Sequence, residues 1–290
     1  MERGGAPGGS DVESSHPVTD DSTPSTDAAA FLGLAPAEGA GQWRLPVVEG
    51  ISTAGAFLFG GCALGAAIVA MERDLERPMV WATAHYLSFA NVGEDVDIQV
   101  VEASRGRYTS QARSTGRVGD REIFTVNAGL GSRPSPWDGQ WSVRPDVASP
   151  EDCEVRLPRW AMSNSIMDRL ELRIVKGHQW DDIAGNPVAD GTSAMWVRMP
   201  GLTTSAASLA VLGDYVPWGI AQSLGAWTRA NSLDNTLRIA TIVPTEWVLL
   251  DIRIHAIHNG FGHGLVHLWA EDGTLMATAS QSAIVRDAML

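Results

Sequence analysis

The stretch AGAFLFGGCALGAAIVAM, residues 54–71, carries no charged residue and is long enough to raise the question of a membrane helix. A membrane helix needs about 20 mostly apolar residues, and Lys and Arg near its ends set its orientation. This stretch contains four glycines and has no basic cluster beside it. We therefore predict no membrane span, and instead a short strand over 56–59 followed by a buried helix from Cys62 to about Arg77.

After this helix, the spacing of polar and apolar residues changes from a helical to an alternating pattern. Pro78 ends the helix, because proline cannot continue the helical hydrogen-bond ladder. Alternating polar and apolar residues then predict antiparallel strands at 79–89, 95–115 and 121–131. The second half has the same order, with strands at 170–177 and 194–200, a helix at 208–227, and strands at 235–243, 246–257, 264–272 and 274–286. We infer an internal duplication in an α+β fold, in which antiparallel sheet wraps around a central apolar helix in each repeat.

The duplication divides the chain into four parts. Residues 1–42 are rich in Gly, Ser, Pro, Asp and Thr, and we expect a disordered acidic tail without the apolar core of a signal peptide. The first unit then spans 43–131 and the second spans 164–290. Between them, residues 132–163 hold five prolines without a clear period, which is typical of a connector.

The composition of the chain limits the kinds of binding partner and the cellular compartment that we expect. The formal charge is −13, with 34 acidic residues against 21 basic ones, which disfavours binding to nucleic acid. The only cysteines are Cys62 and Cys153, too few for a disulfide framework and without the spacing of a zinc site. We therefore expect a cytoplasmic protein.

Several short motifs, taken in order, resemble one known family. They are 58–61 (LFGG), 121–124 (REIF), 195–198 (MWVR), 213–215 (GDY), 232–235 (SLDN), 246–250 (EWVLL) and 272–281 (DGTLMATASQ). Their order is similar to that of acyl-CoA thioesterases of the double hot-dog type, the bacterial acyl-CoA thioesterase II group, over roughly residues 43–288. The resemblance implies hydrolysis of a fatty acyl-CoA by a directly attacking water, in a protein that forms a homodimer. It implies no cofactor.

The resemblance also implies a site made of an Asp, a Ser or Thr, and a Gln. Carried onto this chain, the Asp is Asp234 and the Gln is Gln281. Counting onward from Trp247, the hydroxyl position falls on His255, which departs from the family pattern. The residues alone leave plainer roles open, since Asp234 is typical of a turn and Gln281 could face outward from its strand.

Four histidines lie within thirteen residues, at positions 255, 258, 263 and 267. Alternation along a strand allows at most two of the four imidazoles to converge, and catalytic zinc usually needs three ligands. We therefore expect no metal. A pair of His255 and His263 beside the substrate carbonyl and a hairpin pair without any catalytic role both remain open.

Hydrolysis of a thioester also needs N–H donors aimed at the carbonyl oxygen. The start of a helix supplies such donors, so Gly60 with Gly61, or Gly213, are candidates. The first repeat has no carboxylate where Asp234 lies in the second, which favours one site per chain. Two alternatives remain: a noncatalytic protein that binds an acyl or other hydrophobic ligand, and, with less support, an enoyl-CoA hydratase.

Overall fold

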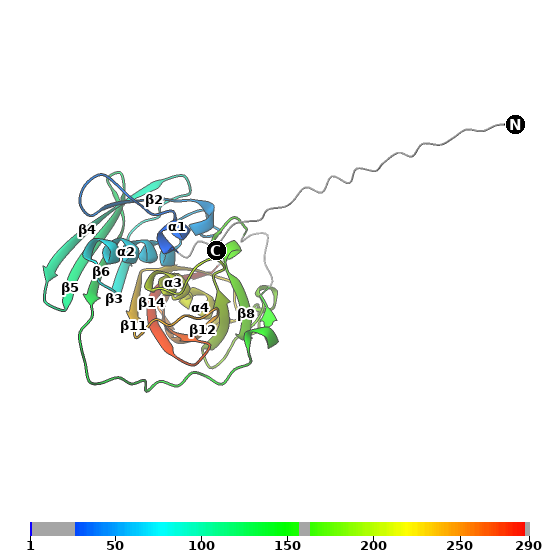
Figure 1. The fold of residues 1–290 in the computed structure, drawn as a ribbon. Coiled ribbons are helices and arrows are strands. Elements are labelled where there is room, and N and C mark those ends of the chain that lie inside the picture. The colour runs from blue at the N-terminus through cyan, green and yellow to red at the C-terminus, as the bar shows by residue number, and fades with distance from the viewer. Residues whose placement is uncertain (2–26, 157–162, 288–290) are drawn as a thin grey trace.

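The computed structural model describes Met1, residues 27–156 and residues 163–287. Antiparallel pairing joins the strands of both repeats into one large curled sheet (Figure 1). The first repeat contributes β1 (Ala35–Pro36), β2 (Gln42–Pro46), β3 (Met79–Tyr86), β4 (Asp95–Arg105), β5 (Thr109–Val118) and β6 (Arg121–Gly131). The second contributes β7 (Glu154–Val155), β8 (Glu171–Lys176), β9 (Thr192–Arg198), β10 (Thr228–Ser232), β11 (Asp234–Ile239), β12 (Val248–His258), β13 (Phe261–Ala270) and β14 (Leu275–Asp287).

The two repeats meet at the antiparallel pair formed by β3 and β11. Thr83 lies opposite Thr236 in this pair, and the two hydroxyl oxygens are 3.0 Å apart. The sheet runs in the order β1-β2-β4-β5-β6-β3-β11-β14-β13-β12-β9-β8-β7, and β10 pairs with the end of β14. The corresponding strands of the two repeats therefore form the seam, as an internal duplication predicts.

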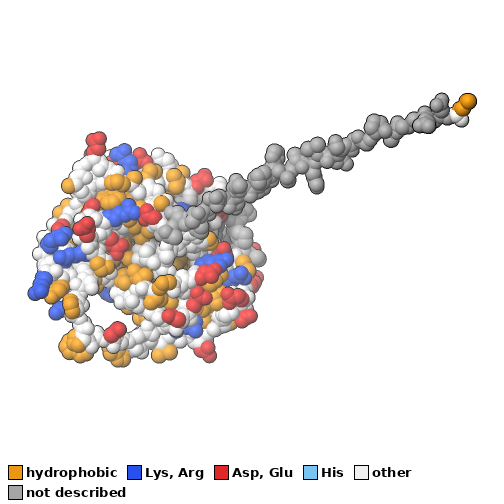
Figure 2. Space-filling model, in the orientation of Figure 1, with side chains coloured by type: hydrophobic (Ala, Val, Ile, Leu, Met, Phe, Trp, Pro, Cys, Tyr) orange, Lys and Arg blue, Asp and Glu red, His pale blue; other side chains and the backbone are white. Residues whose placement is uncertain are grey.

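The helices are α1 (Ala28–Leu32), α2 (Gly60–Leu75), α3 (Ala206–Leu212) and α4 (Val216–Leu224). Short 3-10 turns add η1 (Glu49–Ile51), η2 (Pro150–Asp152), η4 (Ile166–Arg169) and η5 (Trp180–Asp182). No helix in the part of the chain that the structure describes is long and apolar enough to cross a membrane. On the face drawn in Figure 2, acidic, basic and hydrophobic side chains are interspersed.

The quoted stretch forms the central helix of the first repeat. Residues 61–71 of α2 are all buried, between sheet on one side and α3 on the other. Small residues allow this close approach: a Cβ atom at Gly65 would lie 3.1 Å from the Ala207 carbonyl oxygen. The predicted strand at 56–59 is present only as two isolated bridges, between Ser52 and Leu58 and between Phe57 and Asn91.

Two other predictions need correction. The single helix predicted at 208–227 is two helices, because Pro217 has no N–H to continue the ladder and Gly213 ends α3. The predicted disordered tail is ordered from residue 27, where Asp27 caps α1 and Phe31 and Leu32 enter the core. The first repeat therefore begins before residue 43, and residues 2–26 lie outside the described residues.

The connector runs from the end of β6 beneath the second repeat to the side on which β8 lies (Figure 1). Val147 and Cys153 pack against a cluster on the sheet that contains Trp196, Trp247 and Trp269. Toward the end of the connector, β7 pairs with β8, so the strand pairing of the second repeat begins at Glu154. Several of the tryptophans are thus explained by packing beneath the connector rather than by the site.

Candidate active site

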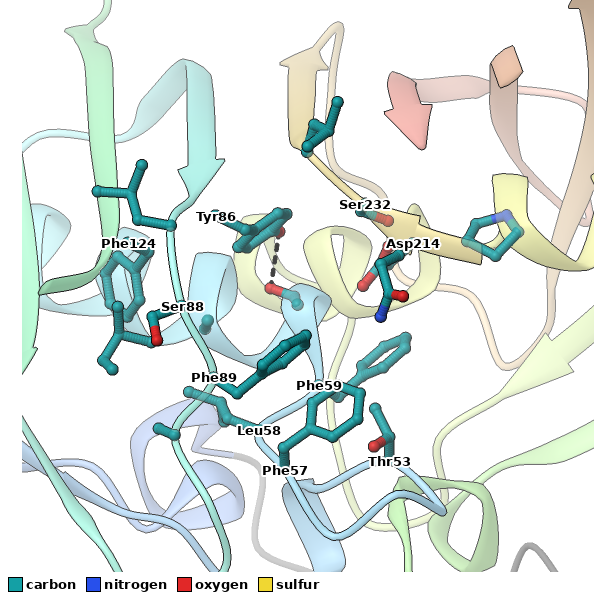
Figure 3. Close-up of a pocket in the computed structure, with 18 of the residues that line it drawn as sticks. Thr53, Phe57, Leu58, Phe59, Tyr86, Ser88, Phe89, Phe124, Asp214 and Ser232 are labelled. Carbon is teal, nitrogen blue, oxygen red and sulfur yellow. Dashed lines mark hydrogen bonds between the residues drawn. The ribbon is translucent and has the colours of Figure 1, made fainter. Parts of the chain in front are cut away.

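A cavity of about 410 Å³ opens at the junction of the two repeats (Figure 3). Its walls are mostly apolar and include four phenylalanines, Phe57, Phe59, Phe89 and Phe124. Asp214 and Ser232 from the second repeat and Gly60 and Tyr86 from the first also line it. The cavity therefore combines an apolar wall with a small polar region, which is typical of a site for a largely apolar ligand.

The break between α3 and α4 determines the position of Asp214. The side chain leaves the break and reaches the first turn of α2, where the Gly61 N–H donates to Asp214 Oδ2 over 2.7 Å. Asp214 is only 7% exposed, so a carboxylate there depends on this donor. A Cβ atom at Gly60 would lie 2.8 Å from Asp214 Oδ2, which is too close for any side chain.

Gln281 on β14 holds the other side of this carboxylate. Its Nε2 donates to Asp214 Oδ1 and also to Ser232 Oγ, the latter over 3.0 Å. Its Oε1 accepts the Val216 N–H at the start of α4 over 3.1 Å. The Gln281 amide is 3% exposed and uses both its donor and its acceptor, which fixes its orientation.

Burial raises the pKa of Asp214 to about 7, even though hydrogen bonds from Gln281, Gly61 and Ser232 favour the ionised form. A carboxyl group with this pKa can exchange a proton near neutral pH, which an exposed Asp does poorly. Asp214 is therefore suited to act as a general base. Ser232 faces the cavity beside it and has a hydroxyl that can orient a water molecule.

Tyr86 contacts the same peptide group that holds Asp214. Its hydroxyl donates to the Gly60 carbonyl oxygen over 2.9 Å (Figure 3). Burial, with Asp214 nearby, raises the pKa of Tyr86 well above 10. The phenol is therefore a neutral hydrogen-bond donor at any pH at which an enzyme would work.

The structure brings one of the three predicted catalytic residues to this site, Gln281. Asp234 is half-buried on β11, where its Oδ1 accepts the Ser282 N–H over 2.8 Å. The carboxylate that contacts Gln281 belongs instead to Asp214. The structure therefore places Asp214, and not Asp234, beside Gln281.

His255 is exposed on β12, and β13 lies between this strand and β14, which carries Gln281. Two strand spacings, roughly 10 Å, thus separate the backbones of the two residues. Ser232 occupies the place beside Gln281 that the sequence count assigned to His255. A hydroxyl side chain thus lies beside Gln281, and it belongs to Ser232 at the end of the short strand β10.

The three glycines that were predicted to donate to the carbonyl oxygen of the substrate differ in the hydrogen bonds of their N–H groups. The Gly213 N–H donates to the Leu209 carbonyl over 2.8 Å, and the Gly61 N–H donates to Asp214. The Gly60 N–H, at the first position of α2, has no hydrogen-bond partner within residues 27–156 and 163–287. Of the three glycines, Gly60 alone combines a free N–H with a place on the cavity wall.

The histidines lie away from this arrangement. His263 is exposed on β13, and its Nδ1 is 3.1 Å from Ser282 Oγ. His267 lies 3.9 Å from the Asp251 carboxylate on β12. Within the described ranges, no three His, Cys, Asp or Glu side chains are grouped so that they could hold a metal ion.

The sequence profiles of two domains match this chain. The acyl-CoA thioesterase N-terminal domain matches residues 48–131, and the acyl-CoA thioesterase C-terminal domain matches residues 147–285. This chain belongs to the acyl-CoA thioesterase family. The enzyme is 26% identical over 259 residues to human acyl-coenzyme A thioesterase 8, covering 79% of this chain and 80% of that protein.

Solved structures agree with the fold of this thioesterase. A candidate thioesterase from Novosphingobium aromaticivorans is similar with a TM-score of 0.78 and 29% identity, over 87% of this chain and 98% of that one. A hot-dog protein of unknown function from Alicyclobacillus acidocaldarius is similar with a TM-score of 0.79 and 21% identity, over 89% and 97%. The predicted double hot-dog fold is thus confirmed, and the thioesterase activity follows from the family.

Two residues of this thioesterase site were not found from sequence, although each had a signal. Pro217 stands in the middle of the predicted helix 208–227, where a proline indicates a break. That break would have directed attention to Asp214, three residues earlier. Ser232 lies two residues before Asp234, in the motif 232–235 (SLDN) whose Asp the resemblance assigned to the site.

Proposed function

We propose that this thioesterase hydrolyses fatty acyl-CoA through a water molecule that Asp214 activates and that Ser232 and Gln281 help to position. One observation carries the proposal: a buried carboxylate with a pKa of about 7 contacts Gln281 and the first turn of α2 on the wall of an apolar cavity. A base with this pKa needs no metal and no covalent intermediate to activate water at neutral pH.

In the proposed reaction, water lies between the Asp214 carboxylate and the Ser232 hydroxyl. Its oxygen attacks the thioester carbonyl carbon while one proton passes to Asp214. The carbonyl oxygen then carries the negative charge, and the Gly60 N–H at the start of α2 donates to it. When the C–S bond breaks, the proton on Asp214 passes to the CoA sulfur, which leaves a free acid and CoA thiol.

The cavity supports a fatty acyl group as the substrate. Phenylalanine side chains make up much of its wall, and a volume of about 410 Å³ is in the range of pockets that hold small apolar ligands. Arg286 is the basic side chain on the cavity wall, where its Nη1 donates to Asn231 Oδ1 over 2.8 Å. Because the phenylalanines form the apolar part of the wall, the proposal places the acyl chain against them.

A panel of acyl-CoA substrates of short, medium and long chain, followed by release of free thiol, tests this proposal. We expect Asp214→Asn to lower kcat by about 10²- to 10⁴-fold, the range for loss of a general base. Asp234→Asn is the matched control and should keep most of its activity. Full activity of Asp214→Asn would exclude the proposed mechanism while leaving the family assignment intact.

The noncatalytic alternative had rested on His255 in place of a hydroxyl residue. We favour catalysis over this alternative because the Ser232 hydroxyl lies beside Gln281, and the family pattern also includes a hydroxyl residue. The proposal includes two further features from sequence, a cytoplasmic location and a homodimer. Light scattering of the purified protein tests the second, with a mass near twice 30.9 kDa expected.

A further inference from the structure

Tyr86 has no part in the proposed water activation, yet it hydrogen-bonds the carbonyl side of the peptide group between Gly60 and Gly61, whose N–H holds the Asp214 carboxylate. It lies at the end of β3 in the first repeat, whereas Asp214, Ser232 and Gln281 belong to the second. The Tyr86 hydroxyl donates to the Gly60 carbonyl oxygen over 2.9 Å. The N–H of the following residue, Gly61, donates to Asp214 Oδ2 over 2.7 Å.

These two hydrogen bonds share a single peptide group. The Gly60 carbonyl and the Gly61 N–H are joined by one amide bond, and amide resonance couples the electron density at the oxygen and the nitrogen. A donor at the oxygen therefore makes the N–H more positive and a stronger donor. Through this peptide, the phenol acts on the Asp214 carboxylate without touching it.

Glycine at position 60 makes the arrangement possible. A Cβ atom there would lie 3.0 Å from Tyr86 Cζ and 2.8 Å from Asp214 Oδ2, so the phenol and the carboxylate both occupy the space beside this glycine. Both side chains line the same cavity. The peptide is thus held from both sides by groups of different repeats.

We propose that Tyr86 is a positioning residue that strengthens the Gly61 N–H and thereby sets the basicity of Asp214. The proposal rests on the proposed function, in which Asp214 is the base. The proposal gives the first repeat a role in the chemistry beyond supplying the start of α2. The hydrogen bond from Tyr86 on β3 to the Gly60 carbonyl changes the basicity of Asp214, which belongs to the second repeat.

The other titratable groups beside Asp214 do not compete for this role. Burial raises the pKa of Cys62 on α2 above its ordinary range and raises the pKa of Tyr215 to about 12. Both groups are therefore neutral where Asp214 titrates. Of the charged groups beyond them, Arg169 acts on Cys62 and Arg156 hydrogen-bonds Tyr215, whereas the Asp234 carboxylate acts on Tyr86 itself and is kept in both variants described below.

The test is the pH profile of kcat/KM for Tyr86→Phe, which keeps the ring and removes the hydroxyl. Without its donor at the Gly60 oxygen, the Gly61 N–H stabilises the carboxylate less, so the pKa of Asp214 rises. We expect the acidic limb of the profile to move upward by about 0.3 pH unit. Tyr215→Phe, which also loses a buried hydroxyl but has no bond to the glycine peptide, should leave the limb in place.

A second variant gives the opposite sign and does not depend on how well Tyr86→Phe folds. The chain has three tyrosines, so in a Tyr108→Phe, Tyr215→Phe background 3-fluorotyrosine can be introduced at position 86 alone. The fluorinated phenol is more acidic and donates more strongly, which should move the acidic limb downward relative to the same background with ordinary tyrosine.

An unchanged limb in both variants, or a change in KM alone, would overturn the role of Tyr86. Such a result leaves the proposed function standing as long as Asp214→Asn is inactive. Conversely, an active Asp214→Asn enzyme would remove the proposed function itself, and with it the reason to expect any shift. The two failures are therefore distinguishable in one set of measurements.

Discussion

The side-chain amide of Gln281 donates a hydrogen bond to the carboxylate of Asp214, although 67 positions separate the two residues in the chain. The same amide bonds Ser232 and the backbone N–H at the start of α4. One buried side chain thus joins a helix break, a short strand and the long strand β14. The predictions below follow from this arrangement.

Ser232, rather than His255, should be the residue whose loss impairs catalysis. Ser232→Ala removes the hydroxyl beside Asp214, and we expect kcat to fall by about 100-fold, as for loss of one polar group that acts in a transition state. Ser232→Thr keeps a hydroxyl and should retain most of the activity. His255→Ala, on an exposed part of β12, is the control, and a large loss in this variant would contradict the site.

Gly60→Ala should inactivate the enzyme. The new Cβ atom would lie 2.8 Å from Asp214 Oδ2 and 3.0 Å from Tyr86 Cζ, so the carboxylate must move away from the Gly61 N–H. We expect a fall in kcat of more than about 100-fold, measured by thiol release. Gly139→Ala in the connector, where the new atom meets only the Trp141 ring at 3.3 Å, should behave as wild type.

The rate should fall as the solution becomes more acidic, because a general base works only when ionised. The pKa of Asp214 is raised to about 7 by burial. We therefore expect kcat/KM to decrease about tenfold per pH unit below pH 7 and to level off above it. A profile that stays flat down to pH 5 would show that a group with an ordinary carboxyl pKa acts as the base.

Asp214 should also lower the stability of the folded enzyme at alkaline pH. Its pKa is about 7 in the folded state against 3.8 for an ordinary Asp, so the folded protein binds the extra proton between these values. The free energy of unfolding then decreases as pH rises from about 4 to 7, by up to about 4 kcal/mol.

Removal of the charge should recover this stability. We expect Asp214→Asn to be more stable than wild type in urea unfolding at pH 8, and the difference to disappear below about pH 3, under the ordinary Asp pKa of 3.8, where the wild-type carboxyl group is protonated in both states. A variant that is less stable than wild type at pH 8 would mean that the lost hydrogen bonds outweigh the cost of the buried charge.

Sequence by itself determined the fold of this protein and part of its site. The uncharged, glycine-containing stretch 54–71 could be assigned to a buried helix because its composition does not fit a membrane and its end is marked by charge and Pro78. Gln281 and the glycine pair at the start of α2 were also found from sequence. The buried helix and its glycine pair follow from local patterns along one stretch of chain, whereas Gln281 follows from the family resemblance of residues 272–281.

Only the tertiary structure decided which carboxylate and which hydroxyl join them. Asp214 lies at a helix break, where it is held by Gly61 of the other repeat and by Gln281 of its own, and Ser232 lies on a strand too short to leave a period in the sequence. A count along the chain from Trp247 leads to His255, but such a count does not show that β13 lies between the strand of His255 and β14. Residues distant in sequence meet through the packing of the two repeats, and that packing depends on all of their contacts at once.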